Sequence, residues 1–331
     1  MHQQAEAVDP IAATARLGLT SPQKSLPPWL FYDETGSRLF EQITALPEYY
    51  LTRTERALFE RYAEDIFLSL MDEALVNPVT IVELGAGTAA KTGILLEAAS
   101  RFQPGVLYQP IDVSHSALAE ARESLERRLP QVVVRAQIAN YVTEPIRIYR
   151  EPGSKVLALY IGSSIGNFSP TEARDILSKL RSQLQPRDAL LLGTDLAPSP
   201  CKSVAALVAA YDDAAGVTAA FNLNILSRLN RELGSNFNLD CFLHKARWNH
   251  EESRIEMHLA STCAQTVTIP ANSVGPAIIL DLLPGETIHT ENSYKFTADS
   301  IATLLAESGF NPTETFTDAK HLFAVTIAEA S

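Results

Sequence analysis

Short apolar runs separated by helical patterns dominate the first two-thirds of the chain. The runs are almost uninterrupted, and they cover residues 79–84, 105–114, 131–138, 155–162 and 188–196. Runs of this length are typical of strands that are buried on both faces of a parallel sheet. Strands that alternate with helices predict an α/β fold with a doubly wound parallel sheet.

The segments between these runs show the spacing of amphipathic helices. One helix is expected over residues 54–70, and another begins at about Thr88, after the first apolar run. The helix that follows the second run carries its apolar residues at helical spacing, namely Leu118, Ala121, Leu125 and Leu129.

Two further helices carry end signals. In the helix expected over 167–180, Ser169 is a candidate N-cap and Glu172, three residues later, completes a capping box. The helix expected over 297–310 is closed by Gly309, a residue type that commonly ends helices.

The pattern changes near Pro198 and Pro200. Residues 203–234 are mainly helical, and a final apolar run at 321–330 predicts a last strand. Between them, residues 254–261 alternate as in a half-buried strand, with one face formed by Ile255, Met257 and Leu259. An α+β insertion is therefore expected to interrupt an α/β domain that resumes at the C-terminus.

Four segments follow from this change of pattern. Residues 56–197 form the main α/β domain, and residues 296–331 return to it. Residues 198–295 form an inserted substrate-binding domain, and residues 1–55 contribute with it to a lid over the acceptor.

Composition narrows the class of partner. The chain has 331 residues and a formal net charge of -12, which argues against binding to nucleic acid or to an anionic membrane. No signal peptide and no run long enough to span a bilayer is present in the sequence, so we expect a cytoplasmic protein. The three cysteines, Cys201, Cys241 and Cys263, are far apart, and we expect all three to be reduced.

The stretch "IVELGAGTAAKTG" (81–93) carries the main chemical signal. Gly85 and Gly87 follow a predicted strand and precede a predicted helix, and Asp112 ends the next strand. This arrangement suits a dinucleotide, and it equally suits S-adenosylmethionine (SAM), because an acid at that place can accept both ribose hydroxyls. Glu83, directly before the turn, and the apolar C-terminal strand favour SAM.

Six blocks of sequence make the likeness specific. The chain resembles the histidine Nα-methyltransferases of ergothioneine biosynthesis in "LPPWLFYDETGSRLFEQITALPEYYLTRTE" (26–55), "VELGAGTAAKT" (82–92), "IGSSIGNFSPTEA" (161–173), "AAYDDAAGVTAAFNLNILSRLNRELG" (209–234), "RIEMHLAS" (254–261) and "GETIHTENSYKF" (285–296). The resemblance implies a class I, Rossmann-like methyltransferase that transfers three methyl groups from SAM to the α-amino group of L-histidine, giving hercynine. It also implies that no metal and no covalent nucleophile is needed.

The resemblance carries over to the cofactor residues one by one. Gly85 and Gly87 line the SAM turn, and Lys91, on the first helix, lies near the methionine carboxylate. Asp112 holds the ribose. Tyr50 closes over the cofactor, with the adjacent Tyr49 as the alternative. The pair that contacts adenine is Asn140 and Tyr141, where the family usually has an acid and an aromatic residue.

The acceptor residues come from other blocks. The resemblance implies that Asn167 and Tyr211 bind the backbone groups of the amino acid, and that Tyr32, Gly162 and Ser164 lie near the reacting nitrogen. Glu291 and Ser293, two residues apart on an expected strand over 289–296, would bind the imidazole, beside a wall formed by Met257.

Three other functions stay open at this point. The chain could methylate another amino acid or small amine, bind SAM without catalysis, or act as an NAD-dependent dehydrogenase. None of His115, His250 and His289 lies in a motif with a spaced acid, so we do not expect a histidine general base. We expect a monomer whose partner is a small amino acid.

Overall fold

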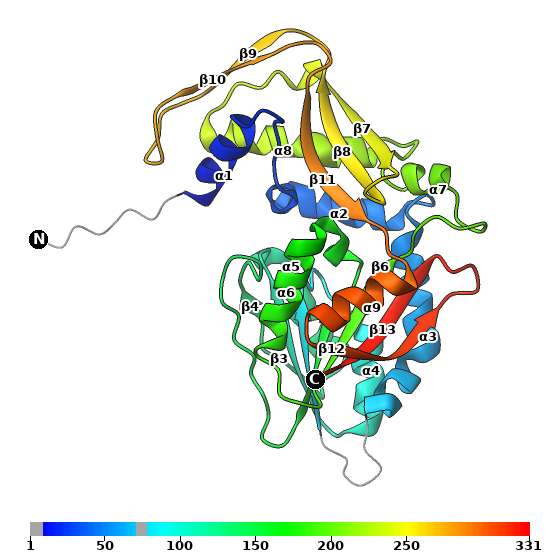
Figure 1. Ribbon diagram of the computed structural model, residues 1–331. Coiled ribbons are helices and arrows are strands. Elements are labelled where there is room, and N and C mark those ends of the chain that lie inside the picture. The colour runs from blue at the N-terminus through cyan, green and yellow to red at the C-terminus, as the bar shows by residue number, and fades with distance from the viewer. Residues whose placement is uncertain (1–8, 71–77) are drawn as a thin grey trace, which may run out of the picture. The chain divides into compact units, whose positions relative to one another are not determined.

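The computed structural model describes residues 9–70 and 78–331, and the chain divides into two compact units. Unit 1 is formed by the chain up to Tyr49 together with Val204–Asn292. Unit 2 is formed by Tyr50–Ser203 together with Ser293–Ser331. Figure 1 labels many of the elements of both units.

Unit 2 contains an eight-stranded sheet in the order β12-β13-β6-β5-β1-β2-β3, with β4 also paired to β2. The pairs β1–β2, β1–β5, β5–β6 and β2–β3 are parallel, whereas β13 is antiparallel to both β6 and β12. The predicted parallel sheet and the predicted last strand are therefore confirmed, and that last strand, β13, runs opposite to β6. The strands are β1 (Val79–Leu84), β2 (Val106–Asp112), β3 (Val132–Val134), β4 (Gln137–Ile138), β5 (Lys155–Tyr160), β6 (Ala189–Asp195), β12 (Phe310–Thr317) and β13 (Phe323–Ala330).

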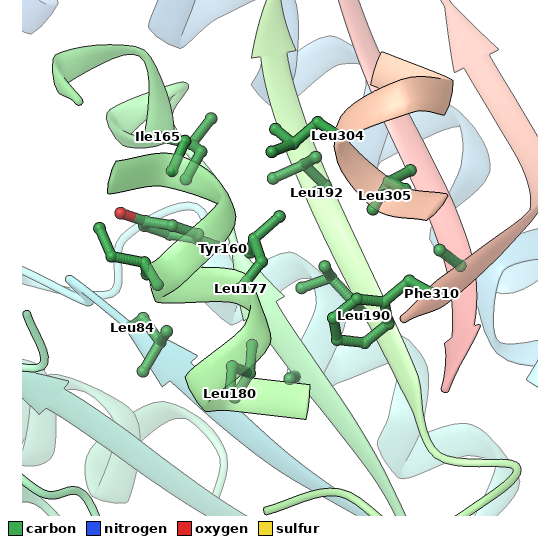
Figure 2. Close-up of a cluster of buried hydrophobic side chains, with 14 of the residues drawn as sticks. Leu84, Tyr160, Ile165, Leu177, Leu180, Leu190, Leu192, Leu304, Leu305 and Phe310 are labelled. Atoms are coloured by element: carbon green, nitrogen blue, oxygen red, sulfur yellow. The ribbon is translucent and has the colours of Figure 1, made fainter. Parts of the chain in front are cut away.

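The apolar runs form strands because helices cover both faces of this sheet. Alternate residues of β1, β5 and β6 join α6 and α9 in one buried cluster, which includes Leu84, Tyr160, Leu177, Leu190 and Leu305 (Figure 2). The intervening residues are buried too, as Ile81, Leu157 and Leu191 show. The run at 131–138 differs from its prediction, because it forms two short strands, β3 and β4, where one was expected.

The helices of unit 2 are α3 (Tyr50–Leu70), α4 (Thr92–Phe102), α5 (His115–Arg128), α6 (Pro170–Arg181) and α9 (Ala298–Glu307). The capping box of α6 is confirmed, since Ser169 Oγ accepts from the backbone N–H of Glu172 and Glu172 accepts from that of Ser169. Helix α4 begins four residues later than predicted. Ala89 has a left-handed φ of 53°, which extends the turn after β1.

Unit 1 contains a three-stranded sheet in the order β11-β8-β7 and a two-stranded sheet of β9 and β10. Helix α8 packs on β7 and β8 and also contacts α1 and α2. The helices and turns are α1 (Pro10–Leu19), η1 (Pro28–Phe31), α2 (Glu34–Ala45), α7 (Val204–Ala209), α8 (Val217–Leu233) and η3 (Leu239–Cys241). The strands are β7 (Phe242–Asn249), β8 (Arg254–Ser261), β9 (Gln265–Ile269), β10 (Ile278–Leu282) and β11 (Thr287–Tyr294), whose last two residues belong to unit 2.

Strand β8 has the predicted bounds but not the predicted half-buried character. Its polar positions are buried as well, because the Glu256 carboxylate binds the side chains of Arg254, Arg247 and His258. Burial alone would raise the pKa of Glu256, but the hydrogen bond from Asn249, together with those from the two arginines and His258, holds it well below its usual range. A charged residue in an alternating pattern therefore faces an ion-pair network here and not open solvent.

The expectation of three reduced cysteines is wrong for two of them. Cys241 and Cys263 form a disulfide, whereas Cys201 is free and exposed. The two bonded residues lie 22 positions apart in sequence, but β7 and β8 are antiparallel, with Phe242 opposite Ser261. This register brings the start of β7 and the residues after β8 together. Within the described parts of the chain, no helix has the length and apolar character of a membrane span.

Candidate active site

The glycine turn lies at the carboxyl edge of the sheet in unit 2. Gly85 and Gly87 have φ angles of 69° and 53°, a left-handed conformation that favours glycine. Gly85 N donates to the carbonyl oxygen of Ile111 at 2.8 Å, and Gly87 N donates to Asp112 Oδ2 at 2.9 Å. No heavy atom lies within 4 Å of a methyl group built on Gly87, so a ligand can approach the backbone there.

Asp112 is the acid of this turn. Its second oxygen, Oδ1, accepts from the backbone N–H of Ser114 at 2.8 Å. Burial raises the pKa of Asp112, and the backbone hydrogen bonds from Ser114 and Gly87 act against that rise. A carboxylate has about four lone-pair positions, so each oxygen can still accept one hydroxyl. This geometry suits a vicinal diol such as that of a ribose.

Tyr141 and Asn140 follow the short strand β4 and lie beside the same turn. A methyl group on Gly85 would meet the Tyr141 hydroxyl at 3.6 Å, and the Tyr141 ring packs edge-on against Tyr160, with centroids 5.6 Å apart. Burial raises the pKa of Tyr141 to about 12. Asn140 Oδ1 accepts from the backbone N–H of Val142 at 3.1 Å, which leaves its amide group and one lone pair for a ligand.

Glu83, the acid before the glycines, has its contacts inside the protein. Its carboxylate is buried and accepts from Thr92 Oγ1 at 2.9 and 2.8 Å and from the Tyr108 hydroxyl. Burial raises the pKa of Glu83 to about 7. Glu83 therefore ties β1, β2 and the start of α4 together beneath the turn.

Lys91 occupies the N-cap position of α4, one residue before the helix on which it was predicted. Its ammonium group pairs with Glu55 of α3, a fully buried carboxylate that the sequence analysis did not identify. Glu55 Oε1 also accepts from the backbone N–H of Gly162 at 2.7 Å. A methyl group on Gly193 would lie 2.3 Å from that oxygen, so this position needs glycine or a shift of Glu55.

The turn after β5 brings Asn167 next to the end of β11. Gly162 and Ser163 have φ angles of 76° and 57°, and the 3-10 turn η2 (Ser164–Asn167) follows. A methyl group on Gly166 would lie 2.8 Å from the carbonyl oxygen of Tyr294, which shows how closely the two segments pack. The side chain of Asn167 is half-buried and makes no hydrogen bond to the residues that the structure describes.

Asp195, at the end of β6, is the centre of a buried polar cluster in unit 2. Its carboxylate accepts from the Tyr50 hydroxyl at 2.8 Å and pairs with the ammonium groups of Lys202 and Lys295, the latter at 2.7 Å. All three charged side chains are fully buried. Lys295 also donates to Ser293 Oγ at 2.9 Å. Tyr50, expected to close over a cofactor, thus places its hydroxyl on Asp195.

Unit 1 contains Tyr32 and Tyr211, the two tyrosines predicted for the acceptor, and Tyr49, the alternative to Tyr50 at the cofactor. The rings of Tyr49 and Tyr211 pack edge-on with centroids 6.1 Å apart, and His244 donates to the carbonyl oxygen of Tyr211 at 2.7 Å. Tyr32 packs edge-on against Phe40 and Phe221, at 5.7 and 5.9 Å.

Met257 and Glu291 lie on neighbouring strands of unit 1, β8 and β11. Both side chains are buried, Met257 at 2% exposure and Glu291 at 9%. Thr290 Oγ1 donates to the carbonyl oxygen of Met257 at 3.1 Å, which joins the two strands at this position. Glu291 and Ser293 are two residues apart in β11 and therefore project to the same side of that strand.

Comparison with known proteins identifies the family. Residues 11–330 match the family model described as "Histidine-specific methyltransferase, SAM-dependent". The chain belongs to this family. It is 40% identical to the "Histidine N-alpha-methyltransferase" of Mycolicibacterium smegmatis, over 97% of this chain and 95% of that protein. It is 38% identical to the protein of the same name from Mycobacterium tuberculosis, over 94% and 92%.

A third relative is larger. The "Ergothioneine biosynthesis protein 1" of Schizosaccharomyces pombe is 34% identical over 64% of this chain, and the match spans 27% of that protein. Family membership makes SAM the cofactor of this methyltransferase, and the glycine turn, Asp112 and the Asn140–Tyr141 pair fit it. These matches give no support to the hypothesis of an NAD-dependent dehydrogenase.

The Asp112→Ala variant of this methyltransferase is expected to bind S-adenosylhomocysteine more weakly, by about 1.5–3 kcal/mol, because hydrogen bonds to a charged acceptor are lost. Asp112 also holds the N–H groups of Gly87 and Ser114, so Asp112→Asn, which keeps one acceptor oxygen, is expected to lose less. Isothermal calorimetry measures both affinities. Unchanged affinity in folded Asp112→Ala would reject Asp112 as the ribose ligand.

Proposed function

We propose that this methyltransferase transfers three methyl groups in turn from SAM to the α-amino group of L-histidine, and that the product is hercynine. The observation that carries the proposal is the match to a histidine-specific family over residues 11–330. The product would serve ergothioneine biosynthesis, the process named for the fungal relative. We further propose that the enzyme acts in the cytoplasm and as a monomer.

Cofactor binding is assigned to residues of unit 2. Gly85 and Gly87 face the cofactor through their backbone, and Asp112 accepts the ribose hydroxyls. Asn140 and Tyr141 bind the adenine through the amide group and the ring face. Lys91, whose ammonium group pairs with Glu55, attracts the methionine carboxylate.

Acceptor binding is assigned residue by residue. Tyr211 and Asn167 bind the carboxylate and the amino group of the amino acid, and Tyr32, Gly162 and Ser164 lie near the reacting nitrogen. Of the two adjacent tyrosines, we propose that Tyr50 closes over the cofactor, with Tyr49, whose ring packs on Tyr211, as the alternative. The Tyr50 hydroxyl is engaged by Asp195.

Histidine selection is assigned to Glu291, Ser293 and Met257. A neutral imidazole presents one N–H donor and one nitrogen acceptor. The Glu291 carboxylate accepts from the donor, and the Ser293 hydroxyl donates to the acceptor. Met257 provides an apolar wall for the ring, and its carbonyl is already bound by Thr290.

Bound SAM supplies a methyl group on a positively charged sulfur, which is an excellent leaving group. The chain therefore has to hold an unprotonated amine in line with that methyl and keep water away. Each transfer would form an N–C bond as the S–C bond breaks, leaving S-adenosylhomocysteine, and the methylated ammonium would release a proton to solvent before the first and second products are methylated again. Positioning by Asn167 and Tyr211 is the main catalytic task of the acceptor residues.

Mass spectrometry of twenty amino acids incubated with SAM tests the proposal. We expect mass gains of one, two and three methyl groups on histidine alone. Methylation of a different amino acid would favour the hypothesis that the enzyme is an N-methyltransferase for that amino acid. SAM binding without methylation of any amine would favour a binding protein without catalysis.

Asn167→Ala and Tyr211→Phe are each expected to raise the KM for histidine by about 5- to 50-fold, because one polar contact to the acceptor is lost. The KM for SAM is expected to change by less than about twofold. Steady-state kinetics with each substrate varied in turn separates the two effects. A large change in the KM for SAM instead would place the altered residue at the cofactor.

A further inference from the structure

Both ring nitrogens of His244, on strand β7, are engaged inside unit 1. Nε2 lies 2.7 Å from the carbonyl oxygen of Tyr211, and Nδ1 lies 2.8 Å from Nδ2 of Asn222 on helix α8. Asn222 Nδ2 also donates to the carbonyl oxygen of His258 at 3.1 Å, so the amide group faces the ring with its NH2 side. A carbonyl oxygen only accepts, and an NH2 group only donates. His244 is therefore neutral and carries its hydrogen on Nε2.

These hydrogen bonds have a fixed direction, from Asn222 to His244 and from His244 to Tyr211. An imidazolium would turn a second N–H towards the NH2 group of Asn222, where no acceptor stands. Asn222 is fully buried, and the side chain of His244 is 2% exposed. Burial lowers the pKa of His244, against the opposing effects of the bond to Tyr211 and of the carboxylates of Asp212 and Asp213. A buried, neutral ring in one tautomer thus joins α8 to the Tyr211 backbone.

The backbone of Tyr211 is bonded at both of its polar groups. Its N–H donates to the carbonyl oxygen of Val208 in α7 at 2.9 Å, and its carbonyl accepts from His244. Two residues later, the Asp213 carboxylate accepts from two N–H groups in the first turn of α8, at 3.0 and 2.7 Å. The bond from His244 therefore ties this segment, which lies between two helices, to the sheet of unit 1.

We propose that His244 is a positioning residue that fixes where Tyr211 presents its hydroxyl to the acceptor, and that Asn222 orients His244 for this task. The inference rests on the proposed function, in which Tyr211 binds the carboxylate of the amino acid. A side-chain hydroxyl moves with the backbone that carries it, and a displacement of about 1 Å takes a hydrogen bond beyond its normal length. His244 therefore acts on acceptor binding through Tyr211.

The test compares variants of the network with a control. His244→Phe keeps an aromatic ring and removes both hydrogen bonds, whereas the amide of His244→Gln can still donate to the Tyr211 carbonyl. Asn222→Ala removes only the bond that orients His244, and it replaces His244→Phe if that variant does not fold. His250→Phe is the control, because it changes an exposed histidine in the turn after β7. The measured quantities are KM for L-histidine, kcat and the affinity for S-adenosylhomocysteine.

His244→Phe is expected to raise the KM for histidine by about 5- to 30-fold, and Asn222→Ala by about 2- to 5-fold. His244→Gln is expected to stay within about threefold of wild type. The affinity for S-adenosylhomocysteine is expected to change by less than about twofold in each variant, because the residues assigned to the cofactor lie in unit 2. His250→Phe is expected to match wild type. A general loss of packing would not be rescued by glutamine and would not spare the cofactor.

A double-mutant cycle connects the effect to Tyr211. In a Tyr211→Phe background, His244→Phe is expected to raise the KM for histidine by less than about twofold further, because the hydroxyl that it positions is gone. A full additional increase there, an unchanged KM in folded His244→Phe, or a parallel loss of cofactor affinity would overturn the proposal.

The same measurements separate this proposal from the proposed function. Lack of histidine methylation by wild type refutes the proposed function, and a wild-type KM in Tyr211→Phe refutes its assignment of Tyr211. A raised KM in Tyr211→Phe together with an unchanged KM in His244→Phe refutes only the role of His244.

Discussion

Glu291→Ala is expected to lower kcat/KM for histidine by about 100- to 1,000-fold. The carboxylate is 9% exposed, and it is the group that we assign to the imidazole N–H. Loss of the carboxylate leaves the imidazole N–H without an acceptor in a buried site. A site that hydrogen-bonds a polar group owes most of its discrimination between substrates to that hydrogen bond. The preference for histidine over tryptophan is expected to narrow by a similar factor.

Kinetics with histidine and tryptophan check this result in wild type, Glu291→Ala and Glu291→Ala combined with Met257→Ala. The double variant gains room on β8 and is expected to favour tryptophan further. Glu314→Ala is the control, because it removes an exposed carboxylate from strand β12. An unchanged histidine-to-tryptophan ratio in all variants would place the selectivity pocket elsewhere.

Asp195→Asn is expected to lower the free energy of unfolding by about 3–5 kcal/mol at pH 7, the cost of leaving buried charges without their partner. Lys202 and Lys295 both pair with this carboxylate and are fully buried. Urea denaturation followed by circular dichroism measures the loss. The control Asp65→Asn, at an exposed position of α3, is expected to change stability by less than about 0.5 kcal/mol.

The stability lost in Asp195→Asn, measured as free energy of unfolding, is expected to become smaller as the pH rises from 7 towards 10. Burial lowers the pKa of Lys202 to about 8 from its ordinary 10.5, so between these values the unfolded chain binds more protons than the folded one. Stability from this group therefore rises with pH across that window. In wild type, Asp195 raises the pKa of Lys202. In Asp195→Asn the protonated form of Lys202 is therefore less stable in the folded state than in wild type. Deprotonation of Lys202 at higher pH then stabilises the variant more than it stabilises wild type. If the difference in free energy of unfolding between wild type and Asp195→Asn grew as the pH rose, this explanation would be wrong.

Sequence patterns correctly predicted the elements whose residues are almost all buried. The strands β1, β5 and β6 were found because the residues of both their faces are buried. Strand β12 was not predicted, since it lies at the sheet edge and its central residues are exposed. Helices α1 and α2 and strand β7 were also missed. The buried residues of α1 do have helical spacing, but two of the three, Ala12 and Ala15, are small, and α2 buries only Gly36 and Ile43.

The residues of the candidate site also fall into two groups, those that could be predicted from the sequence and those that could not. The glycine turn and Asp112 could be predicted because their spacing in sequence is short and the strand ends fix their place. Glu55 and Asp195 could not, because their partners are distant: Gly162 is 107 residues from Glu55, and Tyr50 is 145 residues from Asp195. An acid within an amphipathic helix looks like a solvated residue until the sheet places a lysine and a backbone N–H against it.

Glu55 contacts two turns of unit 2 at once. One of its oxygens faces Lys91 beside the glycine turn, and the other accepts the N–H of Gly162 in the turn that leads to Asn167. An anionic group that draws the Lys91 ammonium towards itself leaves more of the Glu55 charge to be balanced by Gly162. If the proposed cofactor and acceptor residues are right, we expect order in the second turn to depend on occupancy at the first. Because such linkage is reciprocal, an acceptor that fixes the second turn would alter the affinity for the cofactor by the same factor.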